Sequence, residues 1–421
     1  MHRALISDNG KGEDEGSTVS VYPGTRGEFR SSLRKRLTIS SPLATLVTIA
    51  SAHMVHHICR DSIPILFPVL RSEFSLSYAQ LGLLATGSMI ALGLLQLPAA
   101  LFVKWVTRKI ILGSGFLLTS LTTFLTGTAN SFQTLFLWQL MCGVSESTYH
   151  PMGASILGSR FSKKRIGGAM GIHSSGGSIG GILGPILMVY LVTLLDWRWG
   201  LYITAIPGIV MSVVLIFFLA EERNIEAPQS FRLTSEVLSV LRNRRFVTML
   251  AASAAGSFAI GSIRSFTSTY LVSERGASLV QSGFLYTLMV AGGLVGSVVL
   301  GYLSDRLSRK IMLAVLFLLV SLSVFLLTLP VPTALLAVLL ILTGLTLYGT
   351  VPILQAMIMN FVGPELRDAI LGVYFTSDFV VLGLGPLISG LLVDMMGFNW
   401  MFYAISAFLL VASILSLSIH K

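Results

Sequence analysis

Long apolar runs alternate with short polar segments along almost the whole chain. A transmembrane helix needs about 20 consecutive, mostly apolar residues, whereas a buried strand of a soluble α/β protein ends after about 4–8 residues. The runs here are of the longer kind, so the pattern predicts an all-α integral membrane protein with twelve transmembrane helices. We place these helices at residues 43–70, 78–102, 110–129, 132–157, 166–191, 197–220, 246–272, 279–301, 311–329, 333–360, 369–393 and 399–419.

Composition supports this assignment and argues against other classes. The chain is 53% hydrophobic and 11% charged, with a mean hydropathy of +0.80, whereas soluble domains carry about 25% charged residues. The two cysteines, Cys59 and Cys142, lie inside apolar runs, which indicates neither a disulfide framework nor a zinc site. The sequence contains no G-x-x-x-x-G-K-[S/T] pattern and no nucleophile motif, so we expect neither an enzyme nor a bound cofactor or metal.

The lysines and arginines predict the orientation in the membrane. With both termini in the cytoplasm, all but five of the 29 lie on the cytoplasmic side. Arg71, Arg198 and Arg275 lie outside, and Arg60 and Arg264 lie within spans. This bias predicts a protein of the cytoplasmic membrane with both termini cytoplasmic. The net charge of +10 is then explained by charges that face lipid headgroups; no basic, aromatic-interleaved motif indicates a nucleic-acid partner.

The polar segments divide the chain. Residues 1–42 are expected to be a disordered cytoplasmic tail, because the first 36 are polar and carry five acids, unlike a signal peptide. The longest interior loop, 221–245, is expected to link an N-terminal six-helix bundle, 43–220, to a C-terminal one, 246–421.

The two bundles are related by an internal repeat at an offset of 201 residues. The matched positions are glycines, prolines and charges rather than leucines, which chance apolar similarity would match. They include Gln80 with Gln281, Gly82 with Gly283, Arg108-Lys109 with Arg309-Lys310, Gly184-Pro185 with Gly385-Pro386, and Trp199 with Trp400. Two parallel six-helix repeats resemble the major facilitator superfamily. The resemblance implies a substrate site near the membrane midplane between the halves, and rocking of the halves that alternates access.

GYLSDRLSRK (301–310) resembles the superfamily signature G-x-x-x-D-R-x-x-R-K. The resemblance implies close packing at Gly301, pairing of Asp305 across a cytoplasmic gate, and inside-facing charges at Arg306, Arg309 and Lys310. The alternative is that these charges only set topology. The first-half counterpart, ALFVKWVTRK (100–109), keeps only Arg108 and Lys109, so any gate is asymmetric.

GGSIGGILGP (176–185) resembles the glycine-rich segment of facilitator antiporters. Gly180 and Gly184, four residues apart, allow close approach of helix backbones, and Pro185 is expected to bend the helix. We interpret the segment mainly as a packing feature.

Ten ionisable residues stand inside predicted spans, where each is costly and therefore expected to face a cavity or a partner. They are His53, His56, His57, Arg60, Asp61, Glu146, His150, His173, Arg264 and Asp378. The spacing of His53, His56, His57 and Arg60 places them on one helix face. Asp61 follows His57 by four residues and can hydrogen-bond it, and Pro64 removes the helical bond to the carbonyl of Arg60.

Arg60 and Arg264 lie on symmetry-related spans, and two guanidinium groups from facing halves suit phosphate, phosphonate or carboxylate. The alternatives are that Arg60 forms a structural patch with Asp61 and that Arg264 pairs with Asp378 or another acid. Arginines on the first and seventh helices and His173 before a glycine cluster resemble organophosphate exchangers of the superfamily, although Arg264 lies about one turn from the matching position. The resemblance implies anion contacts at Arg60, Arg264 and His173.

Glu146 and His150 are four residues apart and are expected to share a face. TYHPMGAS (148–155) and SAHMVHH (51–57) resemble the fosmidomycin-resistance-like branch of drug exporters. Buried acids and histidines can exchange protons during a transport cycle, so Glu146, His150, His57, His53 and Asp378 are the proton-coupling candidates. Each of them could instead form a structural hydrogen bond between helices.

These features favour a monomeric secondary transporter that moves a small organic anion by proton-linked alternating access. A proton-driven drug exporter is the main alternative, and a non-transporting membrane sensor on the same scaffold is a remote one. The sequence leaves open the substrate, the direction of transport and the coupling ion.

Overall fold

The computed structural model describes residues 38–162, 165–220 and 235–419, except for a few side chains. In these ranges the chain is helical apart from short connections and one isolated bridge between Ile39 and Leu219. The predicted tail 1–42 and linker 221–245 fall largely outside the described ranges, and the described part of the linker contains α10. The predicted division into four segments stays a prediction.

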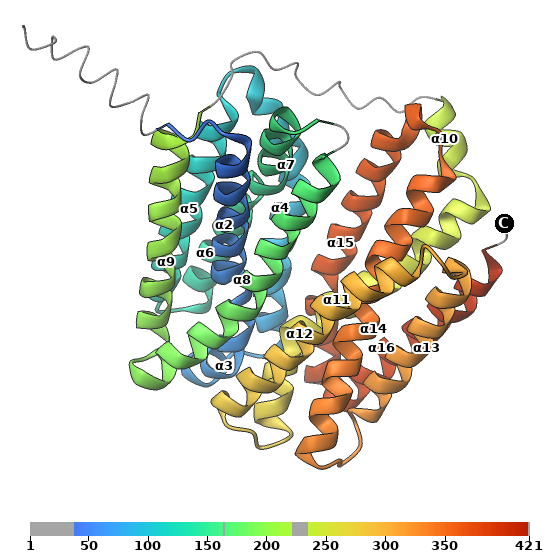
Figure 1. The fold of residues 1–421 in the computed structure, drawn as a ribbon. Coiled ribbons are helices and arrows are strands. Elements are labelled where there is room, and N and C mark those ends of the chain that lie inside the picture. The colour runs from blue at the N-terminus through green and yellow to red at the C-terminus, as the bar shows by residue number, and fades with distance from the viewer. Residues whose placement is uncertain (1–37, 163–164, 221–234, 420–421) are drawn as a thin grey trace, which may run out of the picture. The chain divides into compact units, whose positions relative to one another are not determined.

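The helices of the first half precede residue 220. They are α2 (Pro42–Asp61), η1 (Pro64–Leu66), α3 (Phe67–Phe74), α4 (Tyr78–Leu101), η2 (Phe102–Lys104), α5 (Arg108–Gly127), α6 (Phe132–Glu146), α7 (Tyr149–Arg160), α8 (Ile166–Leu194), α9 (Trp197–Val213) and η3 (Val214–Phe218). The second half contains α10 (Ser235–Leu241), α11 (Arg244–Ser273), α12 (Leu279–Leu303), α13 (Arg309–Leu326), α14 (Thr333–Phe361), α15 (Pro364–Met396) and α16 (Phe398–Ser418). Figure 1 shows α2–α9 gathered in one group and α10–α16 in another.

Ten helices in the described ranges are long and apolar enough to cross a membrane. The two remaining predicted spans, the first and the fourth, are helical but interrupted. The first consists of α2, η1 and α3, and the fourth consists of α6 and α7. Pro64 starts the short η1 segment, as expected where a proline removes a helical hydrogen bond. The all-α class is confirmed, and twelve crossing segments are consistent with this element order.

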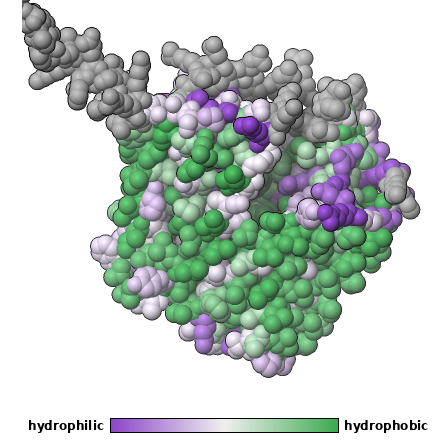
Figure 2. All heavy atoms as spheres, in the orientation of Figure 1, coloured by the Kyte–Doolittle hydropathy of each residue, from purple (hydrophilic) through white to green (hydrophobic). Residues whose placement is uncertain are grey.

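Many large apolar side chains on these helices are exposed, among them Leu117, Phe284 and Val298. In Figure 2 hydrophobic residues cover most of the visible body, and hydrophilic ones gather toward one end. An apolar exterior of this kind is suited to lipid rather than to water.

The internal repeat is visible in local structure. Ser77 and Gln80 form a capping box at the start of α4, and their mates at the offset of 201, Ser278 and Gln281, form the same box at the start of α12. Both helices then contact the opposite half, α4 packing on α15 and α12 on α8. A Cβ at Gly82 would lie 2.2 Å from the carbonyl oxygen of Pro386, so this position requires glycine.

Close contacts between the halves lie toward the predicted outer end. The α4–α15 and α8–α12 contacts include the starts of α4 and α12, which lie at the predicted outer end. At the other end, a Cβ at Gly167, Gly171 or Gly372 would meet nothing within 4 Å. The described residues therefore hold the two halves together at the predicted outer end.

The glycine-rich segment of α8 packs on α2, as predicted. Ideal Cβ atoms at Gly180 and Gly184 would lie 2.2 Å from the carbonyl oxygen of Met54 and 2.9 Å from that of Ile58. Pro185 is buried inside α8, which runs without interruption from Ile166 to Leu194.

The signature residues 301–310 differ from one expectation. A Cβ at Gly301 would lie 3.4 Å from Pro352, an ordinary contact, so close backbone approach does not require this glycine. Asp305 pairs with Arg309 of its own segment at 2.8 Å, and Arg306 donates to the Tyr302 hydroxyl. Among the described side chains, Asp305 therefore makes a local ion pair in this structure. Its pairing across a gate and the inside-facing position of Lys310 stay predictions.

One acid links the halves at the predicted outer end. Asp394 of α15 accepts hydrogen bonds from the backbone N–H groups of Tyr78 (2.9 Å) and Ala79 (2.7 Å) at the start of α4. The first N–H groups of a helix lack partners within the helix and favour a negative charge. The repeat has no second such link, because Thr193, the mate of Asp394, donates to Val189 of its own helix at 2.8 Å.

We expect Asp394→Ala to weaken closure of the predicted outer end, because a capping carboxylate contributes about 1 kcal/mol, which corresponds to roughly a fivefold change in an equilibrium. Spin labels at Asn130 and Glu274, which are exposed in opposite halves, would report a larger population at long distance. Thr193→Ala is the matched control and should leave the distances unchanged. Identical distance distributions for Asp394→Ala and the unsubstituted protein would contradict the role of Asp394.

Candidate functional site

An ion pair joins the two halves in the interior of the bundle. Arg264 of α11 donates through Nη2 to Asp61 Oδ1 at the end of α2. The second carboxylate oxygen, Oδ2, accepts from His57 Nδ1 at 2.9 Å, as the spacing predicted. Asp61 is 3% exposed. Arg264 therefore pairs with an acid other than Asp378, as the alternative for this residue allowed. Among the described side chains, the Arg60 guanidinium forms no ion pair with Asp61.

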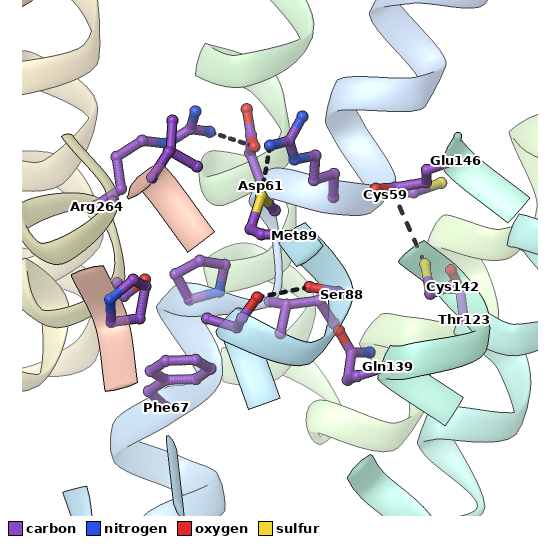
Figure 3. A pocket seen from close by; sticks show the side chains of 18 residues that line it. Cys59, Asp61, Phe67, Ser88, Met89, Thr123, Gln139, Cys142, Glu146 and Arg264 are labelled. Carbon is purple, nitrogen blue, oxygen red and sulfur yellow. Dashed lines mark hydrogen bonds and ion pairs between the residues drawn. The ribbon is translucent and has the colours of Figure 1, made fainter. Parts of the chain in front are cut away.

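The first cavity lies on one side of this pair and is open to solvent; its empty space, counted together with the open solvent at its mouth, is about 660 Å³. Its charged wall contains Arg60, Asp61, Glu146 and Arg264. Figure 3 shows Arg264 and Asp61 pointing toward each other, with Glu146 on the far side beside Cys59 and Cys142. The rest of the lining mixes apolar side chains such as Phe67 with polar ones such as Ser88 and Gln139.

Arg60 differs from Arg264 in its partners. Its Nη2 contacts Met89 Sδ at 2.8 Å, and its Nε has no hydrogen-bond partner. Among the described side chains, no carboxylate lies within 4.0 Å of the Arg60 guanidinium. Arg60 therefore brings to the cavity a positive charge that no carboxylate pairs with directly.

Glu146 is the acid of the cavity that lacks a cationic partner in the described ranges. It is 2% exposed, and its one hydrogen bond comes from the Cys142 thiol at 3.9 Å. The helix α6 ends at Glu146 and α7 starts at Tyr149. His150 lies beyond this break and contacts the rings of His53 and His56. Glu146 and His150, which were expected to share a helix face, therefore contact different groups.

The remaining histidines form a stacked layer behind the ion pair. The rings of His53 and His173 stack with centroids 4.2 Å apart, and His53 Nδ1 donates to the backbone oxygen of His173 at 2.8 Å. The Tyr149 hydroxyl donates to the carbonyl of Ile49 (3.0 Å), so it accepts from His173 Nε2 (2.9 Å). His173 does not line the first cavity, so the structure does not bring it to the two arginines.

A glycine of α8 makes room for this layer. A Cβ at Gly177 would lie 2.6–2.8 Å from ring atoms of His53. The H-x-x-G-G sequence therefore seats an imidazole from the neighbouring helix, in addition to allowing backbone approach.

Asp378 is separate from this cluster. It accepts hydrogen bonds from Ser253 Oγ at 2.8 Å and from Ser257 Oγ, both on α11. Both contacts lie within the second half, and Asp378 does not line the first cavity.

Sequence reasoning recognised Asp61 as a partner of His57 but did not assign it to the site. An acid inside a span, next to an arginine and four residues after a histidine, was the available signal. Its pairing with an arginine 203 residues away depends on the packing of the halves, for which the sequence holds no local signal.

We expect removal of one member of the pair to destabilise the fold by about 3–5 kcal/mol, because it leaves a buried charge without its partner. Asp61→Asn and Arg264→Gln should each do so. The double variant should lose clearly less than the sum, since both charges are gone. Unfolding of the purified protein in mixed micelles measures this cycle, and strictly additive losses would show that the two groups do not interact.

Comparisons with known proteins agree with this architecture. The model of the Major Facilitator Superfamily matches residues 49–381 and 270–420. A bacterial homologue of the human lysosomal transporter Spinster, solved in an inward-facing, occupied conformation, superposes with a TM-score of 0.74 at 19% identity. It covers 89% of this chain and 96% of that one, and this likeness shows the fold.

Curated relatives are transporters. The probable L-galactonate transporter of Escherichia coli K12 is 24% identical over 378 residues, covering 82% of this chain and 81% of that protein. The fosmidomycin resistance protein of the same strain is 24% identical, covering 86% and 89%. A probable hexose phosphate transport protein of Chlamydia pneumoniae is 24% identical, covering 61% and 63%. The resemblances stated from the sequence are thereby confirmed, and the chain belongs to the major facilitator superfamily of multi-pass membrane transporters.

Proposed function

We propose that this protein is a secondary active transporter that carries a small organic anion across the cytoplasmic membrane, coupled to protons. The observation that carries the proposal is the pair of guanidinium groups, Arg60 and Arg264, that face one cavity from opposite halves. Arg60 has no carboxylate partner among the described side chains. Both termini are proposed to be cytoplasmic, and the protein is proposed to act as a monomer.

A guanidinium inside a membrane protein is costly unless an anion faces it. Arginine suits this task because its planar fork binds carboxylate or phosphate through two parallel hydrogen bonds. In the structure the Arg264 guanidinium forms an ion pair with the Asp61 carboxylate. We infer that a substrate anion bridges Arg60 and Arg264 and takes the place of Asp61 on Arg264.

His173 has a supporting role in this proposal. Its contacts are with Tyr149 and His53 rather than with the cavity. It positions the histidine layer behind Asp61 instead of contacting the anion.

Glu146 is the proposed main proton-coupling residue. An acid at a helix C-terminus faces the negative end of the helix dipole, and α2 and α6 end at Asp61 and Glu146. Asp61 is stabilised there by Arg264. Glu146 has no ion-pair partner among the described side chains, so protonation can neutralise its carboxylate instead. His57, bonded to Asp61, is a second candidate. Of the other candidates, His53 shares with Arg264 only a second cavity, on the histidine side of the pair, and His150 and Asp378 line neither cavity.

The relatives support an anionic substrate. Their names refer to a sugar acid, a hexose phosphate and a phosphonate antibiotic, all of which carry a group that arginine binds well. Efflux of an anionic drug is the second candidate. It is favoured by the apolar side chains of Ile63, Phe67 and Leu382 in the lining of the first cavity and by the fosmidomycin resistance relative.

We expect Arg60→Ala and Arg264→Ala each to reduce anion counterflow in proteoliposomes at least a hundredfold, because each removes one fork of the site. Arg60→Lys should recover little, since an ammonium cannot bind bidentately.

Arg244→Ala is the matched control, since Arg244 is exposed at the start of the same helix as Arg264. Thermal unfolding of each variant separates loss of transport from loss of fold. Anion counterflow that persists in both folded alanine variants would refute the anion site. Vesicles of both orientations then distinguish uptake from efflux.

We expect Glu146→Gln to retain anion exchange but to lose accumulation driven by a pH gradient, because the amide cannot take up a proton. A pH dye inside the vesicles measures proton movement alongside substrate flux. Glu274→Gln, at an exposed acid that lines neither cavity, should change neither. Proton-driven accumulation in Glu146→Gln equal to that of the unsubstituted protein would remove Glu146 from the coupling step.

A further inference from the structure

The Asp61–Arg264 pair stands between two cavities. The first cavity contains Arg60 and Glu146. The second cavity lies on the histidine side of the pair and is open to solvent; its empty space, counted together with that open solvent, is about 560 Å³. Asp61 and Arg264 line both. The pair is therefore a shared wall, and a ligand group bound to Arg264 has two spaces into which the rest of the molecule can extend.

The second cavity presents hydroxyl groups. Ser174 and Ser178 of α8 lie on one side, and Tyr348 of α14 lies on the other. In the described ranges the hydroxyls of Ser174 and Tyr348 make no hydrogen bond. Ser178 Oγ donates to the backbone of Ser174 at 3.3 Å, which leaves its oxygen free to accept.

Glycines open the space in front of these hydroxyls. A Cβ at Gly181 would lie 3.0 Å from Asp61 Oδ2, and one at Gly293 would lie 2.8 Å from the ring of Tyr348. Larger residues at these positions would displace the carboxylate or the phenol. The missing side chains of Gly181 and Gly293 thus leave room for Asp61 in the shared wall and for Tyr348 on the other side of the cavity.

The two cavities differ in charge. Arg60 lines only the first cavity, whereas the described lining of the second has no arginine or lysine besides the shared Arg264. An anionic group is therefore best placed between Arg60 and Arg264. The first cavity, which holds both arginines, also contains polar side chains such as Ser88 and Gln139 among its apolar ones. The uncharged part of the same molecule can extend past Arg264 into the second cavity, where it would meet hydroxyls.

We propose that the second cavity is a subsite for the hydroxylated, uncharged part of the transported anion, with Ser174, Ser178 and Tyr348 as specificity-determining residues. This inference rests on the proposed function. The substrate class is then a polyhydroxylated acid or phosphate ester. Its anionic group displaces Asp61 from Arg264 and so opens the shared wall, and its hydroxyls exchange hydrogen bonds with the three side chains.

The test compares ligands that differ only in hydroxyl groups. The probes are a six-carbon aldonate with hexanoate, and glycerol phosphate with propyl phosphate, each measured by inhibition of counterflow and by thermal shift of the full chain. We expect the hydroxylated member of at least one pair to bind better. In Ser174→Ala/Ser178→Ala and in Tyr348→Phe this advantage should fall about tenfold, or about 1.4 kcal/mol, with binding of the deoxygenated probe unchanged.

Ser175→Ala is the matched control, because Ser175 lies on the same helix, bonds Gly171 of its own helix at 3.1 Å and lines neither cavity. If the unsubstituted protein binds both members of each pair equally, or if the variants weaken both members equally, the subsite proposal is overturned while the anion site stands. If none of the four anions binds, both proposals fail.

Discussion

The ion pair between Asp61 and Arg264 is the interaction on which the arrangement of the cavities depends. Within a membrane each charged side chain costs roughly 2.5–3.5 kcal/mol on insertion scales, and pairing across the halves offsets that cost for both groups. The pair also fixes what surrounds it: His57 holds the second oxygen of Asp61 at 2.9 Å, and Arg60 is left facing the first cavity without a carboxylate. In each of the two interrupted spans, the first helix ends at an acid of this cavity: α2 ends at Asp61 and α6 ends at Glu146.

Small residues make this arrangement sterically possible. Helix association in lipid depends on close packing rather than on apolar burial from water. Gly180 and Gly184 bring α8 against α2, Gly177 seats the His53 ring, and Gly181 leaves room for the Asp61 carboxylate. One stretch of α8 thus serves both backbone contact and the placement of ionisable groups, because each successive glycine faces a different part of α2.

The class and the repeat could be predicted from the sequence because they rest on local properties. Apolar runs define spans, Lys/Arg bias predicts orientation, and the capping residues Ser77 and Ser278 recur at the predicted offset. The His57–Asp61 contact followed from spacing on one helix. The Arg264–Asp61 pair and the packing of His173 on Tyr149 did not, because they depend on the rotation of one helix against another. Asp394 at the start of α4 likewise joins segments that only the assembled halves bring together.

The proposed coupling follows from charge balance in the first cavity. With Glu146 ionised, the two arginines and the two acids Asp61 and Glu146 sum to zero, which is the favourable state of an empty cavity in a medium of low polarity. A bound monoanion adds one negative charge, and one proton on Glu146 removes one, so the loaded cavity is again neutral. Anion without proton, or proton without anion, leaves a net charge to be moved through the membrane. A dianion needs a second proton, and His57, hydrogen-bonded to Asp61, is the proposed site for it. The number of protons carried should therefore follow the charge of the substrate.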